Sequence, residues 1–223
     1  MSDVIITVRG DDEARIAPEQ ASLHLSVRTE GPARAEVVER TLALAEPVRD
    51  GIVAREVSGT VVEWSSKRLA VHAQRSWGKE GRRSAPVFSA SVDFTATFAD
   101  AAELSVWVSE VSSWDGVEIG DVRWILTPGT RASVERDVAA RAVGVAVARA
   151  TAYAEALGLS TVVPLEIADV GLLSRGDGGS PIVPKTARAA AFSVNGSDSS
   201  PAMDYQPDDI VVSATVEARF TAR

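Results

Sequence analysis

The chain has 223 residues, with 23 Lys and Arg against 31 Asp and Glu, no Cys and 45% hydrophobic residues. The net charge of −8 disfavours an extended nucleic-acid footprint, and the apolar content excludes disorder over the whole chain. The absence of Cys excludes a disulfide framework, a thiolate metal site and a cysteine nucleophile. The composition therefore predicts an acidic globular protein, long enough for one large domain or two small ones.

The N-terminal residues do not have the pattern of a secretory leader. The apolar stretch Val4–Val8 is short and follows Asp3, where a leader carries basic residues. The longest weakly polar stretch, 142–148, lies between Arg141 and Arg149 and is far shorter than the roughly 20 residues that span a bilayer. We expect a cytoplasmic protein without direct membrane insertion.

Strict alternation of apolar and polar residues predicts antiparallel strands. The alternation is clearest at 21–29, 87–98 and 210–221. Weaker alternation marks five further segments, at 4–9, 57–64, 68–77, 117–126 and 163–172. Because each strand has one polar side, we expect antiparallel sheets with helices on one face.

Three helices are expected between these strands. The first covers 32–51, where Gly51 ends the helix and Pro47 kinks its last turn. The second covers 100–115 and begins at an Asp N-cap. The third, at 130–158, has an Ala-rich inward side, which lets a helix lie close to a sheet.

These elements predict an α+β fold in which residues 1–223 form a single domain. The order strand-strand-helix-strand occurs over 4–64 and again over 68–126, which suggests a ββαβ repeat at the level of topology. Residues 174–209 form a long irregular arm, within which the apolar segment 189–194 is expected to dock.

No residue type in the chain forms a recognisable catalytic or metal-binding set. His24 and His72 lie on the polar sides of expected strands, and neither has a carboxylate or second ligand paired with it in the sequence. Asp11-Asp12-Glu13 lies between two expected strands and lacks the spacing of a calcium loop, so we interpret it as a solvated turn. Asp208-Asp209 is interpreted in the same way. We therefore predict no catalytic, cofactor-binding or metal-ligating residue, and no cofactor.

Two further motifs lack the context that a site requires. The Gly-rich stretch 176–179 is not placed between a strand and a helix and has no Lys-Ser or Lys-Thr after it, so it does not predict a phosphate loop. Lys79 and Arg82-Arg83 form a basic tip between two expected strands, which is most simply solvated.

All five Trp residues fall between positions 64 and 124. Trp107 and Trp114 are seven residues apart on the apolar side of the second helix and are interpreted as core. Trp64, Trp77 and Trp124 lie near strand ends or on mixed faces, where a large aromatic residue is either core or an interface anchor. Both readings stay open.

Several motifs appear in an order that resembles a known family. They are Ile6–Gly10, Pro18–Ala21, Leu23–Val27, Phe88–Asp100, Ala139–Gly158 and Tyr205–Asp208. Together they resemble the SIMPL-domain family, a bacterial group that includes periplasmic immunogenic, outer-membrane-associated and stress-related proteins. Glu19, Phe88 and Asp208 depart from the Asp, Tyr and Gly usual in that family. The resemblance implies an α+β fold and ring- or channel-like self-assembly in some members, with no agreed catalytic residues.

Three hypotheses for function follow. The first is a non-enzymatic homo-oligomer, built through sheet edges, exposed Trp and the 174–209 arm, that acts as a scaffold in envelope or stress responses. The alternative is a small-ligand binding module with a cavity between the Ala-rich helix and the sheet. The third, a hydrolase or other enzyme, needs convergent polar groups that two His and no Cys do not supply.

Overall fold

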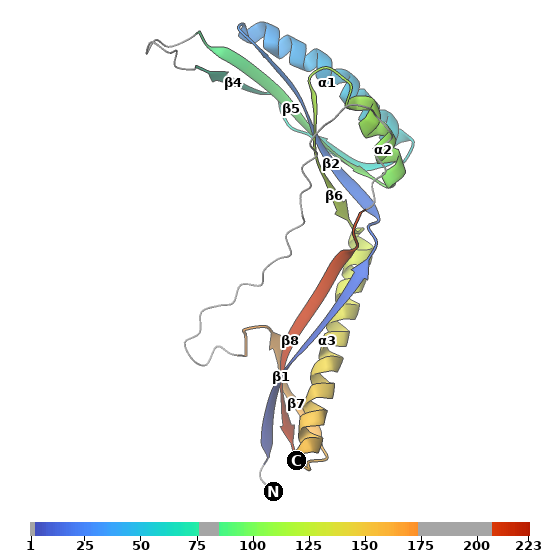
Figure 1. Cartoon of the computed structure of the whole chain (residues 1–223), viewed down its shortest axis with the longest axis vertical. Helices are drawn as coiled ribbons and strands as arrows, with labels where there is room; N and C mark the ends of the chain where they lie inside the picture. The colour runs from blue at the N-terminus through green and yellow to red at the C-terminus, as the bar shows by residue number, and fades with distance from the viewer. Residues whose placement is uncertain (1–2, 76–84, 174–206) are drawn as a thin grey trace. The chain divides into compact units, whose positions relative to one another are not determined.

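The computed structural model describes residues 3–75, 85–173 and 207–223, and these form eight strands and three helices (Figure 1). The strands are β1 (Val4–Ile16), β2 (Gln20–Gly31), β3 (Val61–Ser66), β4 (Ala70–Gln74), β5 (Val87–Phe98), β6 (Val117–Ile125), β7 (Val162–Asp169) and β8 (Ile210–Ala222). The helices are α1 (Arg34–Val57), α2 (Ala101–Val111) and α3 (Pro128–Ala156). All the strand pairs are antiparallel, which confirms the predicted fold class.

The chain divides into two compact units. The first unit contains β1, α3, β7 and β8, and the second contains β2 to β6 with α1 and α2. Each unit has its own sheet and its own buried cluster of apolar side chains. The three helices are thus shared between two sheets: α3 belongs to the first unit, and α1 and α2 to the second.

The second unit is a sheet in the order β3-β5-β2-β6, with β4 also paired to β5. Helices α1 and α2 cover one face of this sheet (Figure 1). In each of the segments β2-α1-β3 and β5-α2-β6, a strand of the other segment lies between the two strands in the sheet. This is the split βαβ arrangement. The ββαβ repeat expected over 4–64 and 68–126 is not confirmed, because β1 pairs with β8 in the other sheet.

Helix α1 is longer than the sequence pattern predicts. It continues through Pro47 and Gly51 to Val57, so the expected end at Gly51 is wrong. Val48 and Ile52, which directly follow Pro47 and Gly51, are fully buried against the sheet. Packing of this apolar face therefore outweighs the helix-breaking preferences of Pro and Gly.

The first unit is a three-stranded sheet in the order β1-β8-β7, with α3 along one face (Figure 1). The side of α3 that faces the sheet consists mainly of alanines, all buried: Ala142, Ala146, Ala150 and Ala154. Gly10 of β1 lies directly under this row, and a Cβ atom there would overlap the backbone oxygen of Ala142. The small side chains allow the close approach of helix and sheet that the sequence predicts.

Within the described residues, no helix is both long and apolar enough to cross a membrane.

Candidate functional site

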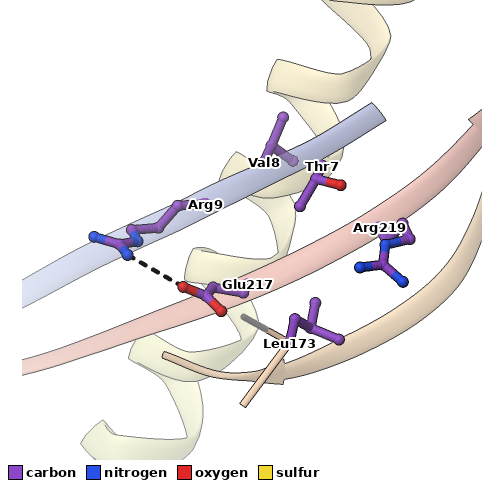
Figure 2. Close-up of a pocket in the computed structure, with 6 residues that line it drawn as sticks. All are labelled: Thr7, Val8, Arg9, Leu173, Glu217 and Arg219. Carbon is purple, nitrogen blue, oxygen red and sulfur yellow. Dashed lines mark hydrogen bonds and ion pairs between the residues drawn. The ribbon is translucent and has the colours of Figure 1, made fainter. Parts of the chain in front are cut away.

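The first unit has an open depression on the sheet face opposite α3 (Figure 2). Its volume is about 500 Å³, and it is lined by Thr7, Val8, Arg9, Leu173, Glu217 and Arg219. Strand alternation places most of these side chains there, because the intervening residues of β1 and β8 point toward α3. Two strands, β1 and β8, and the turn after β7 therefore contribute to one surface.

Two ion pairs cross this surface. The Arg9 guanidinium lies 3.1 Å from a Glu217 carboxylate oxygen, and Arg219 donates to Glu166 on β7 over 2.7 Å. Arg9 and Arg219 lie on either side of Glu217 (Figure 2). Glu217 is only 7% exposed, and a carboxylate at that depth requires a partner of opposite charge. The pairs join β1 to β8 and β8 to β7.

These contacts form a network of ion pairs across the three strands. Both arginines are bound by carboxylates. Thr7 supplies the hydroxyl of the lining, and no histidine that could act as its general base is among the lining residues. Sequence reasoning missed this cluster, because Arg9 and Glu217 are 208 positions apart. Only their shared position on polar strand faces hinted at it.

The two histidines lie in the second unit, on the sheet face away from α1 and α2. His24 is half-buried opposite Thr95 of β5, and His72 is exposed opposite Ser89 of the same strand. Six residues of extended chain separate Thr95 from Ser89, which is about 20 Å. The histidines therefore cannot share a metal ion or a proton relay.

The acidic cluster Asp11-Asp12-Glu13 is not the turn that we expected. All three residues belong to β1, where they pair with Thr215, Ala214 and Ser213 of β8. Asp12 accepts from Arg141 Nε over 2.7 Å, and Asp11 lies 3.3 Å from Arg149 Nη1. The negative charges are accommodated in a strand because two arginines of α3 neutralise them.

Asp208 and Asp209 are exposed just before β8. Among the described residues, no group of three or more His, Asp or Glu side chains is arranged to hold a metal ion.

The described tryptophans all belong to the core of the second unit. Trp107 is fully buried and stacks at a tilt on Phe98, with 5.4 Å between ring centroids. Trp64, Trp114 and Trp124 are half-buried and pack against the same cluster. The packing favours the core reading over the interface-anchor reading for Trp64 and Trp124, while Trp77 lies outside the described residues.

A second depression, of about 380 Å³, lies in the second unit between α1 and the sheet. Leu42, Ala45, Val92 and Phe94 contribute to its apolar lining. Both depressions lie away from the contact between α3 and its sheet, where the ligand-binding alternative places its cavity.

The remaining motifs lie outside the described residues. They are the 176–179 Gly stretch, the basic tip at Lys79 and Arg82-Arg83, the 189–194 segment and nearly all of the 174–209 arm.

A family model described as SIMPL, protein of unknown function (DUF541), matches residues 6–220, almost the whole chain. No curated protein matches the chain.

Proposed function

We propose that this chain, which belongs to the SIMPL family, is a non-enzymatic protein that associates with copies of itself and serves as a scaffold. The observation that carries the proposal is a row of exposed apolar side chains along β7 and the turn that follows it. Val163, Leu165 and Ile167 of the strand, with Val170 and Leu172 after it, are each between 38% and 56% exposed. Val163 lies opposite Thr221 and Ile167 opposite Ala218, so the register shift between them puts exposed apolar side chains on both faces of this edge strand. Such exposure on an edge strand is typical of a protein–protein contact.

The backbone of β7 indicates which kind of contact this surface makes. Thr161 and Arg223 exchange two backbone hydrogen bonds, of 2.9 and 3.0 Å. In an antiparallel ladder, hydrogen-bonded pairs alternate with pairs whose backbone groups point away from the partner strand. Pro164 opposite Phe220 is three positions after Thr161, so its nitrogen faces away from β8. Proline has no N–H to donate there, and the register shift after Pro164 interrupts the strand again. Association is therefore expected through side-chain packing rather than through a continued ladder.

The non-enzymatic part of the proposal is supported by the separation of the chemically active side chains. His24 and His72 are about 20 Å apart along β5. The charged groups around the first depression are engaged in ion pairs. A screen with chromogenic esters and phosphate esters is expected to give no turnover. Turnover that disappears in His24→Ala would overturn this part.

The association is tested by light scattering behind a sizing column at tens of micromolar protein. The wild-type chain is expected to exceed the 23.5 kDa of a single copy, and Leu165→Asp with Ile167→Asp to return it to that mass. The matched control is Val57→Asp with Val106→Asp, because these residues of the second unit are also exposed, at 83% and 59%. A wild-type particle of 23.5 kDa, or an unchanged mass in the β7 variant, would overturn the proposal.

A further inference from the structure

We infer that the edge of β1 away from β8, with which no other described strand pairs, is a self-pairing edge. Arg149 of α3 holds this edge closed, and its partner is β1 of a second copy. This edge belongs to a different strand from the exposed apolar side chains on β7, and its pairing does not require them.

The ladder directions show which backbone groups of β1 are at the edge. The backbone N–H and C=O of Arg223, just after β8, bond to Thr161, just before β7. Every second residue of β8 counted back from Arg223, including Glu217, therefore also directs its backbone groups toward β7. Arg9 lies opposite Glu217, so the carbonyl of Arg9 points away from β8. The same holds for every second residue from Ile5 to Arg15, which gives a long row of outward donors and acceptors.

Arg149 occupies the middle of this row. Its Nη1 donates to the carbonyl oxygen of Arg9 over 2.5 Å and lies 3.3 Å from the Asp11 carboxylate. Ala146 and Ala150, its neighbours on α3, are fully buried against the sheet, so the base of the side chain is fixed. A second strand that paired with this edge would need the same carbonyl for its own N–H. Arg149 and a partner strand therefore compete for one acceptor.

The sequence of β1 is complementary to itself when two copies run antiparallel with Gly10 opposite Gly10. Arg9 then faces Asp11 of the other copy at two symmetric positions, and Thr7 faces Glu13. Sliding the strands by two residues places Arg9 opposite Arg9 in one direction and Asp11 opposite Asp11 in the other. Opposite charges across a strand pair stabilise it and like charges destabilise it, so one register is favoured.

The other arginine of α3 that binds β1 does not cover a backbone group at this edge. Arg141, two turns earlier on α3, binds the side chain of Asp12 over 2.7 Å. The side chain of Asp12 is on the face toward α3, not at the edge. Arg141 therefore ties α3 to β1 without blocking an outward backbone group, which makes it a matched control for Arg149.

The experiment uses paired cysteines in the full chain, which has none of its own. Thr7→Cys with Glu13→Cys places two thiols opposite each other in the favoured register, at the roughly 5.5 Å between Cα atoms that a disulfide bridges. Within one copy these positions are six residues apart on an extended strand, about 20 Å, and cannot join. All variants carry Leu165→Asp and Ile167→Asp, so that association through β7 does not contribute.

With Arg149→Ala added, oxidation is expected to give the covalent dimer as the main species on non-reducing gels. The Arg149 parent and Arg141→Ala are expected to remain monomeric. Arg149→Met, which keeps the aliphatic stem and removes the donor, is expected to behave like Arg149→Ala, with an unchanged circular dichroism spectrum. Thr7→Cys with Arg15→Cys tests the register, since these thiols are two residues out of alignment and are expected not to join.

Three results would overturn the inference. Monomeric Arg149→Ala and Arg149→Met with intact spectra would show that the edge does not pair. Equal crosslinking in the Arg149 parent would show that Arg149 does not close it. Equal crosslinking of the Thr7 and Arg15 cysteines would show that the register is wrong.

Discussion

Replacing Gly10 by Ala tests the close contact between β1 and α3. A Cβ at this position would overlap the backbone oxygen of Ala142 and lie 2.7 Å from the backbone nitrogen of Ala146. Both atoms belong to the helical backbone, so no side-chain rotation relieves the overlap and α3 must move away from β1. Overpacking costs about 1–3 kcal/mol, and we expect the upper end of that range here. That corresponds to a loss of roughly a hundredfold in the folding equilibrium.

The assay is urea unfolding of the full chain, followed by two signals. All five Trp lie within residues 18–125 of the second unit, so Trp fluorescence reports that unit. Far-UV circular dichroism includes the 29 residues of α3. Gly10→Ala is expected to shift the dichroism transition to lower urea more than the fluorescence transition.

The control is Gly144→Ala on α3. Nothing lies within 4 Å of a Cβ at this position, and Ala in place of a helical Gly is expected to stabilise by about 0.5–1 kcal/mol. If Gly10→Ala is as stable as the wild type, or if both substitutions have the same sign, the close packing of α3 on β1 is refuted.

Two further predictions concern the core of the second unit and are measured by the same unfolding experiment. Trp107→Ala is expected to cost about 3–5 kcal/mol, and Trp107→Phe much less, because the buried Nε1 has no hydrogen-bond partner among the described residues; equal losses would contradict this. The hydroxyls of Thr29 and Thr41 lie 2.6 Å apart and both are buried, so Thr41→Val alone is expected to cost about 1–3 kcal/mol. The double variant with Thr29→Val is expected to recover part of this loss, and strictly additive losses would show that the two hydroxyls are not coupled.

Alternation predicted the strands well where one face is uniformly apolar. The segment 87–98 is β5 with the same bounds, and 210–221 differs from β8 by one residue. Alternation did not predict the partners, because it records only which side of a strand is buried. The pairing of β1 with β8 joins residues more than 190 positions apart, and nothing local in either segment specifies it.

Two of the differences between expected and observed element bounds have the same origin. Asp11-Asp12-Glu13 belongs to β1 and not to a turn, although acidic residues are unfavourable in a strand. The arginines that neutralise Asp11 and Asp12 lie more than 120 positions away on α3. Gly51 lies inside α1 and faces Trp107 of α2, where a Cβ atom would lie 3.4 Å from Nε1. In both cases a distant packing partner overrides the local preference.

The ladder between β1 and β8 also determines how this molecule responds to tension. Val4 lies opposite Ala222, so the two ends of the described chain emerge at the same end of an antiparallel pair. A load applied to both ends would break the ladder one rung at a time, like a zipper, instead of loading all the rungs together in shear. Optical-tweezer stretching from these two attachment points should therefore peel β1 and β8 apart at low force.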